Sequence, residues 1–453
     1  MKKFITYILL LSMCLIDTIP TYAAQTKVPK IDAKSAIVMD AQTGQILYEK
    51  SMNKIKYPAS LTKLMTVLLT LENCKLNEKV TFSQEAVYGI EPGSSNIGIL
   101  PGEILTVKQC LYGMMLESAN EVCSAIAEHI SGSVEQFSKL MTKRAKELGC
   151  ENTQFKNANG LHHDKHYTTA YDMALILKEV LKYPEFRTIA SSRNYRLKKT
   201  NKQKGRWLGN HHKMIRYPTE SIYSLSPSLT PTSGKTAFTT RAKTCLATSA
   251  TNGDMELICI VMEDTGISVY WDTKHLLEYF FNNYEHIKPL QSYEVQTIES
   301  DNFIAHNFFS LVQPQILTIH INANYIVSVP KNYTKKRLTT SFKQQLDTNH
   351  NTLGTLSIYY NKKKIGQTPV FFTPFIADSI SHITAYKEFD FSHFSPNHFH
   401  FYMLSPTERG FLLGCTLIFL LLALKFLHFY MQLIQKRKAL NQRCHSRSNK
   451  CNN

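Results

Sequence analysis

A serine and a lysine stand three positions apart at the start of a strongly apolar stretch, as Ser60 and Lys63 in "YPASLTKLM". On a helix, side chains at this spacing project to the same side. An amine among apolar neighbours loses basicity, because burial disfavours its charged form. Such an amine can accept the proton of a neighbouring hydroxyl, which activates the oxygen as a nucleophile. The pair therefore predicts acyl transfer through a serine.

Serine and lysine three apart also occur by chance, so the pair needs support from elsewhere in the chain. Two short motifs supply it. "SAN" places Ser118 two positions before Asn120, between two helical patterns, and "KTAF" places Lys235 and Thr236 in a strand-like run. In this order the three motifs correspond to the S-x-x-K, S-x-N and K-T-G set of penicillin-binding proteins and class A β-lactamases.

The elements that must position these residues follow from hydrophobic periodicity. Apolar positions from Leu61 onward repeat at helical spacing, and Pro58 precedes this helix, where its missing N–H is tolerated. Further helices are predicted at 106–116, 121–130 and 134–148, and one more begins with a capping box of Thr169 and Asp172. Strands are predicted at both ends of this helical region, in "SAIVMDAQTGQILYEKS" and at 243–263. The first and last strands can therefore be neighbours in one sheet flanked by helices, an α/β fold.

The downstream sequence changes to alternation with period two. Residues 316–330 and 354–372 read as short strands joined by polar turns. We therefore predict a catalytic domain at 30–285 and a smaller β-rich domain at 288–388.

Both ends of the chain carry targeting signals. Residues 1–24 have the pattern of a signal peptide. Residues 410–434 form an apolar run of bilayer-spanning length, after a linker at 389–409 and before a basic tail at 435–453. The positive charges of the tail favour a cytoplasmic location for it. We therefore expect a single-pass protein of the cell membrane with its catalytic domain outside the cytoplasm.

Composition narrows the classes of partner. The 453 residues are 43% hydrophobic and 19% charged, and the formal net charge is +17. Part of that charge lies in the basic tail and the rest is scattered over an exported body without an RNA or DNA motif, so an anionic cell-wall polymer or lipid surface is favoured over nucleic acid. Six cysteines in the body lack the spacing of a metal site or of a small disulfide scaffold, and we expect them to be packed thiols: Cys74, Cys110, Cys123, Cys150, Cys245 and Cys259.

Between Ile31 and Phe372 the chain resembles the low-molecular-weight penicillin-binding proteins, the serine D-alanyl-D-alanine carboxypeptidases (peptidase S11-like). The resemblance extends from the three motifs to "DAQTGQILYEK", "LPGE", "SGSVEQFSKLM" and "GLHHDKHYTTAYDMA". It implies a serine DD-peptidase/β-lactamase-like domain with an antiparallel sheet flanked by helices, followed by a smaller all-β domain and a C-terminal transmembrane helix. It also implies a peptidoglycan pentapeptide substrate, covalent inhibition by β-lactams, and no cofactor or metal.

The resemblance assigns a role to each motif residue. Ser60 would be acylated and Lys63 would accept its proton, while Ser118 would relay a proton to the leaving D-alanine. The remaining groups would bind substrate: Asn120 the peptide carbonyl, Lys235 and Thr236 the terminal carboxylate, and the backbone N–H groups of Ser60 and Phe238 the oxyanion.

Two departures from the family pattern bear on activity. Ala237 stands where the family has the glycine of K-T-G, and its methyl group could narrow the cleft. An arginine that relatives often carry shortly before an aspartate is absent, with Val269 near the expected place before Asp272. The departures leave a weakened wall-binding scaffold as the alternative of a different class. DD-endopeptidase or transpeptidase activity stays open, whereas a class A β-lactamase is disfavoured because no E-x-x-L-N stretch follows the S-x-N motif.

Histidines and aspartates near the motifs have simpler explanations than catalysis or metal binding. We expect the H-H-x-x-H of His162, His163 and His166 to form a loop ahead of a helix. Asp164 and Asp172 are expected to cap or turn the chain. A supporting role near the cleft is expected for His211 and His212.

Overall fold

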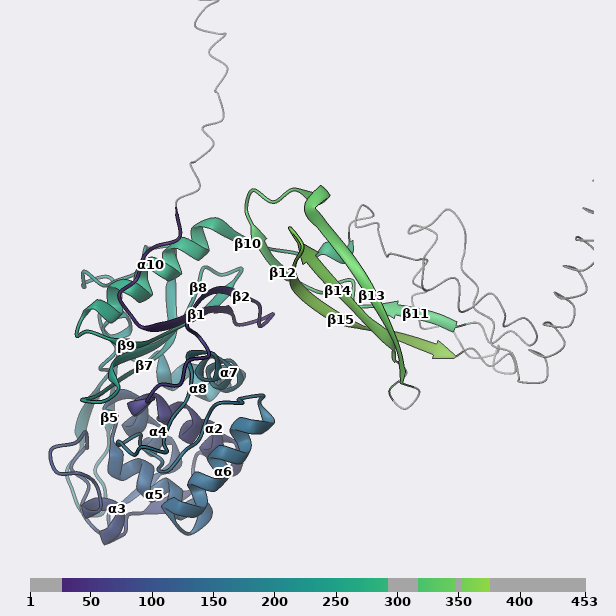
Figure 1. Ribbon diagram of the computed structural model, residues 1–453. Coiled ribbons are helices and arrows are strands. Elements are labelled where there is room, and N and C mark those ends of the chain that lie inside the picture. Colours follow the sequence, from purple (N-terminus) through teal and green to yellow (C-terminus); the bar gives the residue numbers. More distant parts are fainter. Residues whose placement is uncertain (1–26, 292–316, 348–349, 351, 375–453) are drawn as a thin grey trace, which may run out of the picture. The chain divides into compact units, whose positions relative to one another are not determined.

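The computed structural model describes residues 27–291, 317–347, 350 and 352–374 (Figure 1). Two compact units divide the chain: the first ends at Ile287 and takes in Val327–Asn332, and the second holds Lys288–Ile326 and continues from Tyr333. The predicted signal peptide, the linker at 389–409, the apolar run at 410–434 and the basic tail lie outside the described residues. No helix within the described part is long and apolar enough to span a membrane.

An antiparallel five-stranded sheet forms the centre of the first unit, as the sequence predicts. The first strand of the chain pairs with the last strand of the helical domain: Val38 lies opposite Cys259. The order across the sheet is β2 (Ile46–Lys50), β1 (Ser35–Asp40), β9 (Glu256–Asp264), β8 (Lys243–Thr251) and β7 (Thr230–Thr239). β7 is thus an edge strand.

The sheet is covered by helices on both faces, which explains why β1 is buried along its whole length. Ile37 and Met39 belong to one hydrophobic cluster, and Ala36 and Val38 to another. Alternate residues of a strand point to opposite faces. Accordingly, α7 (Ala170–Val180) packs on β1 and β9 from one side, and α10 (Ser268–Asn283) packs on β8 and β9 from the other.

The helical region is built around α2 (Lys63–Asn73), whose residues 63–70 are all buried. The predicted helices at 106–116, 121–130 and 134–148 are confirmed within two residues, and Thr106 forms a complete capping box with Gln109. Thr169 caps α7, because its side chain accepts from the N–H of Asp172. The predicted capping box is incomplete, because the Asp172 carboxylate accepts from Asn152 and Thr153 instead of from the N–H of Thr169. The other helices of this unit are α3 (Gln84–Tyr88), α4 (Val107–Leu116), α5 (Asn120–Ser131), α6 (Val134–Glu147), α8 (Pro184–Ala190) and α9 (Lys213–Arg216). Two further strand pairs are β3 (Lys79–Thr81) with β4 (Ile104–Thr106), and β5 (Asn194–Leu197) with β6 (Arg206–Gly209).

A late segment of the chain completes the first unit. β10 (Tyr284–Ile287) pairs with β12 (Val327–Pro330). Ser328 donates its hydroxyl hydrogen to the buried Asp40 carboxylate, which His286 also contacts. Gln45 exchanges two hydrogen bonds with the Ser328 backbone.

The second unit is β-rich. Its described part is an antiparallel sheet in which β14 and β15 pair along most of their length. The strands are β11 (Leu317–Ile321), β15 (Lys363–Pro374), β14 (Thr352–Tyr360) and β13 (Leu338–Asp347) in spatial order, and short 3₁₀ turns occur at η2 (Pro289–Gln291) and η3 (Lys335–Arg337). β13 lies in a stretch that the sequence did not predict as a strand.

The entrance to α2 is a 3₁₀ turn, η1 (Ala59–Thr62), rather than the first turn of the α-helix itself. Ala59 has a φ of +45°, which is unusual for a residue with a side chain. Gly160, with a φ of +91°, packs so closely on η1 that a Cβ there would lie 1.9 Å from the Ala59 carbonyl oxygen. The loop 157–161 and the turn that carries Ser60 are therefore fitted to each other.

Replacing Gly160 with alanine should separate this loop from η1. The left-handed backbone alone disfavours alanine by about 1–2 kcal/mol, and the backbone clash should bring the loss of unfolding free energy to about 3 kcal/mol or more. Chemical denaturation measures the change. Gly149→Ala is the matched control, since Gly149 has a similar φ of +86° but a Cβ there would find its nearest neighbour at 4.0 Å. Equal losses for the two variants would contradict the close fit.

Candidate active site

The Lys63 amine is the centre where the motifs meet. Its Nζ lies 3.0 Å from Ser60 Oγ and 2.7 Å from Asn120 Oδ1. A third contact, 2.7 Å long, joins it to the backbone oxygen of Asn159. Lys63 is fully buried, and burial lowers its pKa although Cys123 and Glu121 nearby act in the opposite direction. Once it has lost a proton, the same nitrogen can accept one from Ser60.

Asn159 is a site residue that sequence reasoning missed. It contributes a backbone oxygen, so its side-chain type gives no direct signal. The Asn-Gly pair at 159–160 indicates a turn. The turn is held from within, because the Asn157 side chain accepts from Gly160 N at 2.7 Å. Only the folded structure places its carbonyl against Lys63.

The S-x-N motif occupies the turn between α4 and α5. Ser118 has a φ of +60° and is almost fully buried, and among the described residues its Oγ has no hydrogen-bond partner. Asn120 is the first residue of α5, and its N–H donates to the Ser95 carbonyl. The structure thus joins Asn120 to the Ser60 and Lys63 pair through Lys63.

The third motif lies on the edge strand β7, which packs against η1. Lys235 is buried and donates to the Thr236 carbonyl at 3.0 Å. Burial and the nearby Lys63 together lower the pKa of Lys235 to about 7, although Cys123 and Glu117 oppose the shift. Lys63 and Lys235, which belong to two of the three motifs, are therefore close enough to influence each other's charge. Phe238 is 67% exposed, and because its ring has no hydrogen-bond donor, only its backbone N–H can serve the predicted oxyanion role.

Ala237, the departure from K-T-G, leaves the strand regular. It lies opposite Cys245, and the only shift of register between β7 and β8 falls earlier, between Pro231 and Ser233. Its methyl group is buried as part of the cluster that also contains Ala59. The strand is therefore not tilted at this point.

His212 lies behind the motif and supports the strand. A Cβ on Gly234 would come within 2.3 Å of its ring, so glycine is required there. His212 Nε2 bonds to Thr248 Oγ1 at 2.8 Å, and burial lowers the pKa of His212 to about 3. It is therefore a neutral packing group. His211 is more exposed, and its Nε2 lies 2.9 Å from a carboxylate oxygen of Glu117.

The H-H-x-x-H histidines have separate tasks. His166 is buried, and its Nδ1 accepts from Lys156 N, so Nε2 carries the hydrogen that is donated to Thr62 Oγ1 at 2.8 Å. Burial lowers the pKa of His166 to about 3. His162 packs edge-on against Tyr57. His166 thus contacts η1 from the loop side through Thr62.

Val269 and Asp272, where the family arginine was sought, lie on α10. Val269 is fully buried, and the Asp272 carboxylate accepts from the backbone N–H groups of Asp32 and Ala33, both at 2.9 Å. This carboxylate therefore anchors the N-terminal segment.

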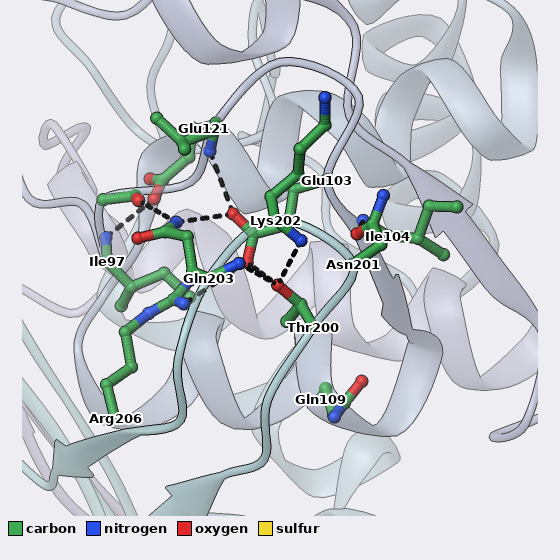
Figure 2. A network of polar contacts seen from close by, with 12 residues as sticks. Ile97, Glu103, Ile104, Gln109, Glu121, Thr200, Asn201, Lys202, Gln203 and Arg206 are labelled. Atoms are coloured by element: carbon green, nitrogen blue, oxygen red, sulfur yellow. Dashed lines mark hydrogen bonds and ion pairs between the residues drawn. The ribbon is translucent and has the colours of Figure 1, made fainter.

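A buried polar network fixes the loop that backs the S-x-N motif (Figure 2). Glu103 is fully buried and accepts from Thr200, Gln203 and Arg206 in and beside the β5–β6 hairpin. The Gln203 amide also donates to the Gly98 carbonyl at 2.7 Å. Next to Gly98, the N–H of Ile97 donates to Glu121 Oε1 at 2.7 Å. Residues 97–103 are thus held between the hairpin and α5.

Comparison with known proteins identifies the family of the chain. The profile of the family described as D-alanyl-D-alanine carboxypeptidase, Peptidase_S11, matches residues 22–266, just over half of the chain. The chain belongs to this family. It is 30% identical over 369 residues to D-alanyl-D-alanine carboxypeptidase DacC of Escherichia coli, covering 77% of this chain and 86% of that relative.

Two further relatives show how far the likeness extends. Identity to D-alanyl-D-alanine carboxypeptidase DacF of Bacillus subtilis is 38%, over 56% of this chain but only 63% of the relative. The Streptomyces K15 DD-transpeptidase structure is 27% identical, with a TM-score of 0.51, covering 56% of this chain and 98% of that one. Penicillin binding protein 5 from Haemophilus influenzae shares the fold with a TM-score of 0.61 at 24% identity, over 76% of this chain and 98% of that one.

The low pKa of Lys235 predicts that carboxylate binding depends on pH. Above about pH 7 the lysine of the free protein loses its charge, so the Michaelis constant for a substrate with a terminal carboxylate should rise by up to about tenfold per pH unit. Steady-state kinetics between pH 6 and pH 9 measure this slope.

Lys235→Arg provides the control, because a guanidinium stays charged throughout this range. The variant should bind more weakly overall, with a Michaelis constant that changes little with pH. A flat profile in the unaltered protein would show that Lys235 does not govern substrate affinity.

Proposed function

We propose that the protein is a serine D-Ala-D-Ala carboxypeptidase that removes the terminal D-alanine from peptidoglycan pentapeptides. The observation that carries the proposal is the buried Lys63 amine between Ser60 Oγ and Asn120 Oδ1. A lysine in this position can act as a general base because its pKa is lowered by burial. Family membership and the named relatives support the same activity.

Acylation follows from the arrangement. Ser60 Oγ attacks the carbonyl carbon of the penultimate D-alanine while its proton passes to neutral Lys63. Backbone N–H groups of Ser60 and Phe238 stabilise the oxyanion of the tetrahedral intermediate. The C–N bond then breaks, and the leaving D-alanine nitrogen takes a proton through Ser118. Water releases the acyl group from Ser60 in the second half of the cycle.

Substrate recognition rests on different side chains. Lys235 and Thr236 bind the terminal carboxylate, a charge-assisted contact. Asn120 orients the peptide carbonyl. β-Lactams present a carboxylate beside a reactive amide, so they should acylate Ser60 and remain bound as covalent inhibitors.

Transpeptidation is the second candidate, favoured by the likeness to the Streptomyces K15 DD-transpeptidase. Both reactions share the acyl-enzyme and differ in whether water or an amine accepts the acyl group. Attachment to the cell membrane through residues 410–434 remains part of the proposal, with the catalytic unit outside the cytoplasm.

The decisive test combines penicillin labelling with product analysis. Purified protein should form a covalent band with a fluorescent penicillin and release D-alanine from a synthetic pentapeptide. Ser60→Ala should remove the band and lower the turnover number by about 10⁴-fold or more, because the nucleophile is lost. Lys63→Ala should slow acylation by about 10²–10⁴-fold.

Ser191→Ala is the matched control, since Ser191 is an exposed serine whose hydroxyl bonds only to nearby helix carbonyls. Labelling without D-alanine release, together with a cross-linked product when an amine acceptor is added, would assign transpeptidation. Absence of any band in correctly folded protein would leave the wall-binding scaffold.

A further inference from the structure

Three metal-binding side chains meet at a place that the proposed reaction does not use. One donor atom from each of Cys74, Glu78 and His129 lies within 4.8 Å of the other two. Cys74 directly follows α2, and Glu78 lies in the turn before β3. His129 comes from the last turn of α5. This cluster could not be predicted from the sequence, because the histidine is separated from the other two donors by about fifty positions.

The carboxylate of this cluster is already oriented. Glu78 Oε1 accepts from Lys75 N at 2.7 Å, and its backbone oxygen accepts from Val107 N at 2.9 Å. Its second carboxylate oxygen, Oε2, lies 3.5 Å from His129 Nε2. One oxygen is thus held by the turn while the other faces the imidazole.

The donor set is the one that Zn²⁺ prefers. A thiolate, an imidazole nitrogen and a carboxylate oxygen are its common protein ligands, at about 2.0–2.3 Å in tetrahedral geometry. Such bonds place neighbouring ligand atoms about 3.3–3.8 Å apart. The 3.5 Å between His129 and Glu78 already fits, and the remaining separations of up to 4.8 Å need a closure of about 1 Å by side-chain rotation. Thiolate and carboxylate together would neutralise the ion.

The surrounding backbone also favours a cation. The C-terminal end of a helix carries a partial negative charge. Cys74 is the C-cap of α2, an 11-residue helix, and His129 lies in the last turn of α5, a 12-residue helix. Two helices thus direct their negative ends to the same place. The exposed Lys75 is the nearby charge that acts against a cation.

We propose that Cys74, Glu78 and His129 bind a Zn²⁺ ion, with water as the fourth ligand. The opposite ends of the same two helices begin with Lys63 and Asn120. An ion at this site therefore ties together the far ends of the helices that present two of the three active-site motifs. Its role is to hold these helices against each other, and it touches no reacting atom.

An ion pair between Glu78 and His129 without metal is the simpler alternative, and the cysteine distinguishes the two. Metal binding requires Cys74 and an ion pair does not. Cys74 is also partly exposed, whereas the other five described cysteines are buried. The absorption of a thiolate–metal bond therefore distinguishes metal binding from an ion pair, and Cys74 is accessible to an added ion.

The test uses the full-length chain, stripped with a chelator and titrated with Co²⁺ and then Zn²⁺. Wild-type protein should show the near-ultraviolet absorption of a thiolate–Co²⁺ bond, which Zn²⁺ abolishes. Cys74→Ser and His129→Ala should each bind one equivalent of Zn²⁺ fewer than wild type, by a competing chromophoric chelator. Zn²⁺ at about 100 times its dissociation constant should raise the melting temperature of wild type by about 5–10 °C, and that of the variants by much less.

His350→Ala is the matched control, because His350 pairs with the Asp347 carboxylate at 2.7 Å on the second unit. This variant should retain the Co²⁺ absorption and the full Zn²⁺ stoichiometry. Melting temperatures in chelator show whether the variants fold, and they should equal that of wild type. Equal stoichiometry in wild type, Cys74→Ser and His129→Ala would overturn the proposal, as would a thiolate–Co²⁺ signal that survives Cys74→Ser.

Discussion

A buried amine that needs three oxygen partners is the constraint on which the rest of the first unit depends. Lys63 has no contact with solvent, so each unmet hydrogen bond there would be costly. Its partners come from three segments far apart in the chain: η1, α5 and the loop 157–161. The apolar surface of α2 keeps water out. The packing of the hydrophobic core and the placement of the catalytic side chains therefore depend on the same contacts.

The backbone around this amine departs from ordinary conformations at both motif entrances. Ala59 and Ser118 carry side chains yet have φ values of +45° and +60°. Each such residue stores of the order of 1–3 kcal/mol of strain, and it persists only where the surroundings fix it. Gly160 against η1 and the Ser95 carbonyl against Asn120 are the fixing contacts. These contacts hold Ala59 and Ser118 in their positive-φ conformations.

Sequence alone predicted the parts of the fold that depend on local pattern. The two strands around a turn that begin at Ser35, the helices at 106–148 and the three motifs each carry their signal within a few residues. Contacts between segments that are far apart in the chain could not be predicted from local sequence patterns. Glu103 receives hydrogen bonds from a hairpin about a hundred positions away, Asn159 contributes only a backbone atom, and Cys74 meets His129 through the packing of two helices. None of these contacts produces a periodic pattern in the sequence.

The first unit is not continuous along the chain. Its last strand, β12, arrives about 40 residues after Ile287, once part of the second unit has intervened. At a synthesis rate of about 5–20 residues per second, several seconds pass between the synthesis of Ile287 and that of β12. During this time the Asp40 carboxylate lacks its hydrogen bond from Ser328. Part of the second unit must therefore be synthesised before the first unit can be completed.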